Sequence, residues 1–394
     1  MNRSGQAGRE NPGTQRSETF QVISGRMYGG GQRVAIDIRD WARRNGQPRN
    51  DLIALGDSDP NMARHADLVI QYDGRYNRPS SILAAAWRLR KKLDEFGWPR
   101  VLHSHGWDAD CIVALARIGR SSRHCVHLHL MADWLKSGSV KSALKRWLTR
   151  RLFKRSGTRV IAVSRAVADH WQAELPLAGE YAPVPVLNGI DVARFGCNRG
   201  DQVRNGPVVL AVAARLAPKK GLEMLLMALA RLSETQVDFV CRVAGSGPLF
   251  GSLRRRVVDL ALDARVQFCG HVEDMHGFYA DADIYIQPSE TEGLPLGLLE
   301  ALASGLAAVA TDVGGTREVL RDGIEGYLIR SGDPAALADA LATLIGNKGL
   351  RLEMGLAARA RVCADFSLDC FGRRVQSVYR ELTEPRDHRS GGSY

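Results

Sequence analysis

The sequence predicts an α/β protein with two domains. Apolar runs of strand composition at 20–24, 208–213 and 283–286 are each followed by a loop rich in glycine, proline or charge and then by a helix-like segment. This order of strand, loop and helix is the repeating unit of α/β proteins. The chain has 394 residues, more than a single hydrophobic core usually serves, so two domains are expected.

The composition is that of an ordinary soluble globular protein. Hydrophobic residues make up 45% of the chain and charged residues 25%. No apolar run approaches the roughly 18 residues that a membrane span needs, and the polar N-terminus lacks the apolar stretch of a signal peptide. We therefore expect a cytoplasmic protein with a disordered leader at 1–18. The seven cysteines include no Cys-x-x-Cys pair, which is typical of a reducing compartment.

The net charge is strongly positive and locally concentrated. It is +11, with an isoelectric point near 9.5, which nucleic acid, an anionic membrane or an anionic substrate would each explain. The most basic segment, 140–155, interleaves lysine and arginine with Leu144, Trp147, Leu148 and Leu152 at helical spacing. Two interpretations stay open: a helix packed on its own domain, or an interfacial helix on anionic lipid.

The stretch 287–318 carries the strongest chemical signal. Proline and glycine interrupt regular structure after a strand-like run, and 296–303 then has helix composition with Glu300 as its only charge. A carboxylate among leucines is costly to bury unless it meets donors. Glu292 precedes this helix, where a helix N-terminus would direct backbone N–H groups at a phosphate. Gly314 and Gly315 repeat the arrangement after a second strand-like run.

This stretch resembles the donor-nucleotide motif of family 4 retaining glycosyltransferases. The resemblance rests on the Glu-x7-Glu spacing with EG at its front, LLEALASG at its back and TDVGGTREV after it. Further matches are the Gly-rich loop 29–31, the Asn-Gly-x-Asp-x-x-x-Phe element at 188–195, and Arg-x4-Lys-Gly at 215–221. The family implies the GT-B fold, in which two Rossmann-like domains face each other across a cleft and the C-terminal helix crosses back to the first domain.

The resemblance and the composition together predict the domain boundaries. The linker is placed where glycine, asparagine and charge accumulate before the strand-like run at 208–213. The expected order is a leader at 1–18, an N-terminal Rossmann-like acceptor domain at 19–195, a linker at 196–207, a C-terminal nucleotide-sugar-binding domain at 208–365, a crossover helix at 366–383 and a disordered tail at 384–394.

The family implies roles for individual residues. Arg215 and Lys220 would hold the donor diphosphate. Glu300 would accept hydrogen bonds from the ribose diol, and Glu292 would contact hydroxyls of the transferred sugar. His129 matches a histidine that lines the acceptor cleft in the family. The implied catalytic residues are His129, Glu292, Arg215 and Lys220. The implied donor contacts are Gly29, Gly30, Gly31, Arg215, Lys220, His271, Val272, Glu292, Gly293, Leu294 and Glu300.

Two His-x-His pairs, at 103–105 and 127–129, end two strand-like runs. Residues two apart share one face of a strand, so the pairs could converge as a zinc site. A zinc-dependent hydrolase is therefore one alternative function, and a non-catalytic basic nucleic-acid-binding protein is another. The family, in contrast, implies no metal and no cofactor, because the nucleotide-diphosphate sugar is a substrate.

A glycoside hydrolase with Glu292 and Glu300 as its carboxylate pair is disfavoured. On one helix, their spacing would separate them by about 12 Å, beyond the roughly 5–9.5 Å that such enzymes use. The resemblance implies instead a retaining, metal-independent hexosyltransferase with a saccharide or lipid-linked acceptor. The expected setting is cell-surface polysaccharide, lipopolysaccharide or glycolipid biosynthesis. We expect no nucleic-acid partner. Through 140–155 the protein would be peripheral at the inner face of the cytoplasmic membrane.

Overall fold

The structure of the chain is a computed structural model. It describes residues 18–24, 29–56, 64–73, 78–135, 138–196, 206–235 and 237–384. The chain clusters into two compact units, residues 1–125 with 383–394 and residues 126–382. Nearly all of the expected tail and leader and most of the expected linker lie outside the described residues, and the domain boundaries stay predictions.

A seven-stranded sheet forms the first half of the fold. Its strand order is β3-β2-β1-β4-β5-β6-β7, and the pairings of β1 with β2 and β4, of β2 with β3, and of β6 with β7 are parallel. The strands are β1 (Thr19–Ser24), β2 (Asn50–Leu55), β3 (Leu68–Ile70), β4 (Val101–His105), β5 (Arg123–Leu128), β6 (Thr158–Ala162) and β7 (Val184–Pro185).

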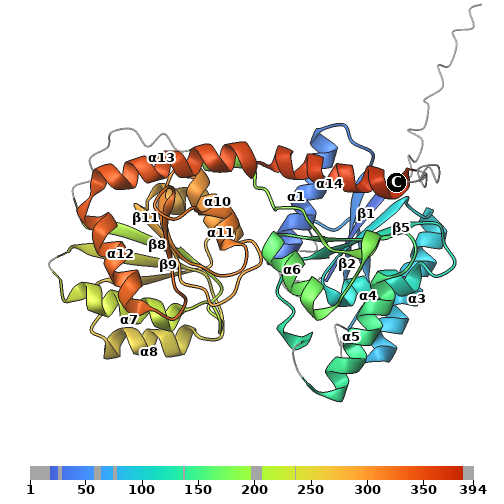
Figure 1. The fold of residues 1–394 in the computed structure, drawn as a ribbon, viewed down its shortest axis with the longest axis horizontal. Helices are drawn as coiled ribbons and strands as arrows, with labels where there is room; N and C mark the ends of the chain where they lie inside the picture. Colours follow the sequence, from blue (N-terminus) through green and yellow to red (C-terminus); the bar gives the residue numbers. More distant parts are fainter. Residues whose placement is uncertain are drawn as a thin grey trace, which may run out of the picture. The chain divides into compact units, whose positions relative to one another are not determined.

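Helices connect these strands. They are α1 (Gly30–Arg44), α3 (Pro79–Phe96), α4 (Trp107–Ala116), α5 (Val140–Phe153) and α6 (Arg165–Glu174), with short 3-10 turns η1 (Asp133–Leu135), η2 (Gly179–Tyr181) and η3 (Val192–Phe195). Around β1 and β2, α1 lies on one face, and α3 with α4 lies on the other (Figure 1). Right-handed crossovers between parallel strands produce this arrangement when the strand order reverses at β1.

A six-stranded parallel sheet forms the second half, in the order β10-β9-β8-β11-β12-β13. Its strands are β8 (Val208–Ala213), β9 (Phe239–Ala244), β10 (Val266–Gly270), β11 (Ile284–Gln287), β12 (Ala307–Thr311) and β13 (Gly326–Ile329). The order reverses between β8 and β11. In doubly wound sheets, ligands bind outside the carboxyl ends of the strands at such a reversal.

Helices cover both faces of this second sheet (Figure 1). They are α7 (Leu222–Ser233), α8 (Phe250–Asp259), α9 (Met275–Ala280), α10 (Leu296–Ala303), α11 (Thr316–Val319), α12 (Pro334–Gly346) and α13 (Lys348–Asp365). Leucines of α7 and α12 share a buried core with β8, β9 and β11, while α10 packs against α13 on the other face. The last helix, α14 (Leu368–Thr383), follows α13.

Much of the local structure agrees with the sequence-based expectations. The helix expected at 296–303 and the strand at 307–311 have the expected bounds. Ser164 caps α6, because its side chain accepts a hydrogen bond from Val167 N at 3.1 Å. The strand expected at 125–129 begins earlier and ends at Leu128, so His129 follows it. Among the helices of the described residues, none has both the length and the apolar character of a membrane span.

Candidate active site

The carboxyl ends of the second sheet gather the predicted donor residues. Arg215 and Lys220 follow β8, and Glu292 to Leu294 follow β11. His271 and Val272 come directly after β10. Because parallel strands end at one edge of a sheet, these loops share that edge.

Glu292 is held by two neighbours at this edge. Lys220 Nζ lies 2.6 Å from Glu292 Oε1, and Ser289 Oγ donates a hydrogen bond to the same oxygen at 2.7 Å. Only 13% of the Glu292 side chain is exposed, so this ion pair is partly shielded from water. Arg215 is exposed, which leaves its guanidinium accessible to a ligand.

Glu300 lies buried on α10, as the leucine-rich sequence around it predicts. Its Oε2 accepts a hydrogen bond from the Tyr279 hydroxyl at 3.4 Å, and that hydroxyl lies 3.3 Å from Gly297 O. Burial, followed by the nearby Glu300 carboxylate, raises the pKa of Tyr279 well above its usual range. Tyr279 therefore stays protonated as a donor to Glu300.

Glycines at this edge allow backbone segments to touch. Gly221 has φ +65°, and a Cβ there would lie 1.7 Å from Pro288 O, which fixes the Lys220 loop against the start of the Glu292 loop. Gly245 has φ +136°, and a Cβ there would lie 1.9 Å from Ala214 O. The Ser246–Gly247–Pro248 segment is thus a turn packed under the Arg215 loop, as the sequence indicates.

His129 lies against the turn that follows Glu292. A Cβ added to Gly293 would come within 2.0 Å of His129 O, so these two backbones are in direct contact. Burial lowers the pKa of His129 to about 4. The imidazole is therefore neutral near pH 7, and its ring stacks on that of His127 with centroids 4.4 Å apart.

Gly29, Gly30 and Gly31 lie at the N-terminus of α1. Gly29 is the N-cap with an extended backbone, and the Gln32 amide donates to Ser24 O at 3.1 Å, joining the helix start to the end of β1. The expected strand, glycine loop and helix are therefore present. The ligand roles of these glycines, like those of the other predicted site residues, stay predictions.

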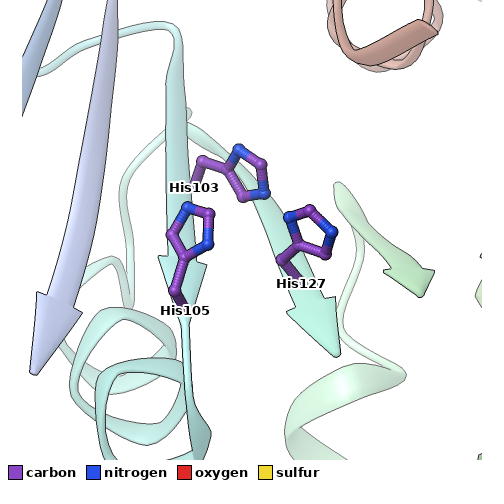
Figure 2. Close-up of side chains that lie close together, drawn as sticks. All are labelled: His103, His105 and His127. Atoms are coloured by element: carbon purple, nitrogen blue, oxygen red, sulfur yellow. The ribbon is translucent and has the colours of Figure 1, made fainter. Parts of the chain in front are cut away.

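Three of the four histidines in the His-x-His pairs lie close together. His103 and His105 on β4 and His127 on the neighbouring β5 are buried, and one ligand atom from each lies within 4.8 Å of the others (Figure 2). His129 is outside this group. His105 Nε2 lies 2.9 Å from Gln21 Oε1, so one ring nitrogen already has a partner. The grouping is what the zinc alternative expects of the strands, although it includes no carboxylate.

The basic helix α5 exposes most of its apolar residues. Val140 is 85% exposed, Leu144 63% and Trp147 58%, whereas Leu152 and Phe153 are buried. The expected single apolar face is therefore split: one end packs and the rest meets solvent. Basic side chains are also exposed along the helix, namely Lys141, Arg150, Arg151 and Lys154.

A cavity of about 490 Å³ lies elsewhere, at the carboxyl ends of β12 and β13. Its lining includes Asp312, Arg317 and Arg330 but none of the predicted catalytic or donor residues. Arg317 is already engaged by a bidentate contact with Asp312. The predicted donor residues therefore lie outside this cavity, in the loops after β8, β10 and β11 and on α10.

Comparisons with known proteins decide the family. A family model described as "Glycosyl transferases group 1" matches residues 198–361, and one described as "Glycosyltransferase Family 4" matches residues 28–194. The chain belongs to the family 4 glycosyltransferases. Together the two models cover every strand of both sheets except β1, and they agree with the family predicted from the sequence. The two family descriptions name glycosyltransferases, and they name neither of the alternative functions, a zinc hydrolase or a nucleic-acid-binding protein.

Relatives of known function are distant. The chain is 28% identical to a glycogen synthase of Mycobacterium tuberculosis, over 76% of this chain and 73% of that protein. It is 34% identical to a phosphatidyl-myo-inositol mannosyltransferase of Mycobacterium leprae, over 56% and 59%. It is 30% identical to the putative colanic acid biosynthesis glycosyltransferase WcaL of Salmonella typhimurium, over 55% and 56%. The last two alignments span less than two thirds of those relatives.

Solved structures confirm the GT-B fold. A glycosyltransferase from Rickettsia africae superposes with a TM-score of 0.78 at 20% identity, covering 94% of this chain and 99% of that one. Anabaena Alr3699/HepE in complex with UDP also gives 0.78, at 21% identity, with 92% and 100% covered. At such low identity, the likeness establishes the fold alone.

Three contacts near the candidate site of this glycosyltransferase were not predicted from the sequence. Ser289 binds Glu292, Tyr279 binds Glu300, and Glu318 accepts from the backbone of α6. Ser289 lies three residues before Glu292, so a serine close to a predicted catalytic carboxylate was an available signal. Tyr279 and Glu318 are distant in sequence from their partners, and only the folded chain joins them.

Proposed function

We propose that this glycosyltransferase is a retaining, metal-independent hexosyltransferase that takes a sugar from a nucleotide-diphosphate donor. The observation that carries the proposal is the Lys220–Glu292 ion pair, which joins the loop after β8 to the loop that enters α10. The cation and the helix N-terminus favour the anionic diphosphate of a nucleotide sugar, and the carboxylate can accept hydrogen bonds from the sugar hydroxyls.

The donor diphosphate would compete with Glu292 for Lys220. An ammonium has three donors, so Lys220 can keep one bond to Glu292 and give another to a phosphate oxygen. Arg215 is exposed and can approach the same phosphates with its planar fork. When the bond between carbon and oxygen breaks, negative charge grows on the departing diphosphate, and these two cations would stabilise it.

The nucleoside would be held by Glu300. One of its oxygens accepts from Tyr279, and an ionised carboxylate has further lone pairs for the two ribose hydroxyls. His271 and Val272 at the end of β10 would lie against the base, with Gly293 and Leu294 against the sugar. Gly29, Gly30 and Gly31 would add backbone donors.

His129 would act in its neutral form near the reacting carbon. Its low pKa excludes a charged imidazolium at pH 7, so it can accept or donate one hydrogen bond to a sugar hydroxyl. The acceptor would attack from the face that the diphosphate leaves, which retains the anomeric configuration. Positioning would supply much of the rate.

The acceptor is proposed to be a saccharide or a lipid-linked saccharide. Relatives are described as a phosphatidyl-myo-inositol mannosyltransferase and a colanic acid biosynthesis glycosyltransferase, which supports cell-surface polysaccharide, lipopolysaccharide or glycolipid biosynthesis. No cofactor is needed, because the donor brings its own leaving group.

A panel of UDP- and GDP-sugars tests the donor. We expect one of these sugars to raise the thermal unfolding temperature of the protein. With acceptor present, the same sugar should release UDP or GDP. NMR of the product should give the same anomeric configuration as the donor. Inversion at the anomeric carbon would refute the retaining mechanism, and absence of both binding and turnover across the panel would refute the donor class.

We further propose that α5 rests on an anionic lipid surface, which would make this cytoplasmic protein peripheral at the inner face of the membrane. The exposed residues Val140, Leu144 and Trp147 provide apolar contact, and 138–157 contains no acidic residue to oppose an anionic surface. Lys145 and Arg146 are engaged locally: the Lys145 ammonium lies 4.0 Å from the Trp134 ring centre, and Arg146 bonds Leu135 O.

Vesicle co-sedimentation tests this surface. Changing Lys141, Arg150, Arg151 and Lys154 to Gln removes four exposed cations. Each is worth about 1 kcal/mol near an anionic membrane, so binding should fall by two or more orders of magnitude, on the order of 4 kcal/mol in all. Wild-type binding should also weaken in ~1 M salt, where the screening length is about 3 Å.

The charge-matched control replaces four exposed cations on other helices. It changes Arg231, Arg254, Arg255 and Lys348 to Gln, on α7, α8 and α13. This variant should sediment with anionic vesicles like wild type, and neutral vesicles should retain little of either. Equal loss in both variants would refute a specific role for α5, and salt-independent binding would refute the electrostatic attraction.

A further inference from the structure

We infer that Ser164 and Glu318 form a positioning junction that fixes the Glu292–Gly293 turn against the strand end at His129. The inference rests on the proposed function, because it assigns the junction a purpose in placing the donor sugar. All residues of the junction belong to 126–382, which is one compact unit.

Glu318 caps a helix to which it is not joined in sequence. Its Oε2 accepts from Arg165 N at 2.9 Å, and its Oε1 accepts from Ala166 N at 3.0 Å. These N–H groups begin α6 and have no partner within the helix, and a carboxylate at that end is favoured by the helix dipole. Arg361 of α13 holds the Glu318 segment by donating to Glu318 O and Val319 O.

Ser164 joins the same helix start to the donor turn. Its Oγ accepts from Val167 N at 3.1 Å and donates to Gly293 O at 2.9 Å. Gly293 O also accepts from Gly315 N at 3.0 Å. The Gly293 carbonyl therefore accepts hydrogen bonds from both the α6 side and the α11 side. Ser164 is fully buried.

Close backbone contacts at two glycines make this junction rigid. A Cβ on Gly315 would lie 2.4 Å from Gly293 O and 2.7 Å from Ser164 Cβ. A Cβ on Gly314 would lie 1.8 Å from Glu292 O. Backbones packed at this distance cannot slide without a clash, so the junction transmits its geometry to Glu292.

A purpose in catalysis follows from where the junction lies. It contacts the Glu292–Gly293 turn, which packs against His129. The proposed function places Glu292 on the transferred sugar and His129 near the acceptor. The junction does not include Arg215, Lys220 or Glu300, which would hold the nucleotide. Loss of the junction should therefore impair the transfer step, which needs reacting atoms aligned, and leave nucleotide affinity intact.

The main experiment compares Glu318→Ala, Glu318→Gln and Ser164→Ala with wild type. Loss of both Glu318 bonds should lower kcat by about 10- to 100-fold, the range for hydrogen bonds to a charged group. The Kd of the nucleoside diphosphate should stay within about two-fold. Glu318→Gln keeps one acceptor oxygen, so its kcat should lie between that of wild type and that of Glu318→Ala. Ser164→Thr keeps the hydroxyl and should restore most of the activity that Ser164→Ala loses.

Two matched controls separate positioning from general stability. Ser139→Ala removes the same hydroxyl from the N-cap of α5, where it accepts from Ser142 N. Glu223→Gln removes a carboxylate from the first turn of α7. Both should leave kcat unchanged. Wild-type kcat in Glu318→Ala would overturn the inference. So would a parallel loss of diphosphate affinity and thermal stability, which a merely structural residue would produce.

Hydrogen exchange provides a readout that needs no donor. The Arg165 and Ala166 amides should exchange faster in Glu318→Ala than in wild type, and unchanged exchange would overturn the junction itself. If wild type turns over no nucleotide sugar while these amides still respond to Glu318→Ala, the proposed function fails and the contact remains. The two failures are thereby distinguishable.

Discussion

Side chains around the loop that enters α10 have partners within the protein, whereas most apolar side chains of α5 are exposed to solvent. Glu292 on this loop, Glu300 on α10 and Ser164 at the start of α6 each have a defined partner, and glycines bring backbones into contact. On α5, Leu144 and Trp147 are left in solvent beside exposed cations. A preorganised site and a surface that gains its contacts from a partner therefore differ in a measurable property: how much stability each residue contributes before any ligand arrives.

The largest effect on catalysis should come from the cations of the donor edge. Arg215→Ala or Lys220→Ala should lower kcat/KM by about 10- to 150-fold, because each removes a charge-assisted bond of about 1.5–3 kcal/mol. Steady-state kinetics with the donor found in the panel measure this. Lys348→Ala, an exposed cation on α13, is the control. A folded double mutant of Arg215 and Lys220 with wild-type kinetics would remove the diphosphate assignment.

The rigidity of the donor edge predicts a large loss of stability for a single methyl group. Gly314→Ala places a Cβ 1.8 Å from Glu292 O at φ +52°, so it should lower the free energy of unfolding by about 1–3 kcal/mol. Gly251→Ala on α8 meets no atom within 4 Å and should be neutral or stabilising by up to about 1 kcal/mol. Urea unfolding of both variants measures the difference, and equal stabilities would contradict the tight packing.

The two ends of α5 should respond in opposite directions. Trp147→Ala should weaken binding to anionic vesicles by about 10-fold or more, as loss of a large apolar contact predicts. Its free energy of unfolding should change by no more than about 0.5 kcal/mol, because Trp147 is exposed.

Phe153→Ala, at the buried end, should instead lower stability by about 3–5 kcal/mol. Vesicle sedimentation and urea unfolding on both variants separate the effects. A stability loss in Trp147→Ala comparable to that in Phe153→Ala would mean that the exposed end of α5 is packed after all.

His129 should produce a modest pH dependence. Its folded pKa of about 4 lies below the ordinary value of 6.5, so the unfolded chain binds the proton first as pH falls. The free energy of unfolding should therefore decrease from about pH 6.5 down to about pH 4, with no contribution from His129 above that window. His129→Gln should flatten this acid limb in urea titrations. An unchanged limb would contradict the lowered pKa of the His129 imidazole.

The smallest effect is expected from chelation. EDTA should leave transfer activity unchanged if Arg215 and Lys220 carry the diphosphate charge without a metal. The histidine group His103, His105 and His127 makes this a real test. Activity that EDTA abolishes and zinc restores would favour the metal alternative, and metal analysis of the purified protein provides an independent measurement.

The sequence determined the local structure with good accuracy. Leucine and alanine composition after a proline predicts the bounds of α10, which the structure confirms. The resemblance to family 4 glycosyltransferases also implied Arg215, Lys220, Glu292 and Glu300 as candidates for one donor site. Such signals are short-range in sequence, so they survive without a three-dimensional context.

The tertiary structure alone decided which partner each side chain meets. Whether the apolar residues of α5 would pack was open from periodicity, since a stripe of leucines suits a core and a membrane equally; packing covers Leu152 and Phe153 and leaves Trp147 exposed. Glu318 reaches α6 across more than 150 residues of chain because the sheets bring distant loops to one place. Contacts of that kind depend on the whole path of the backbone, which no local pattern records.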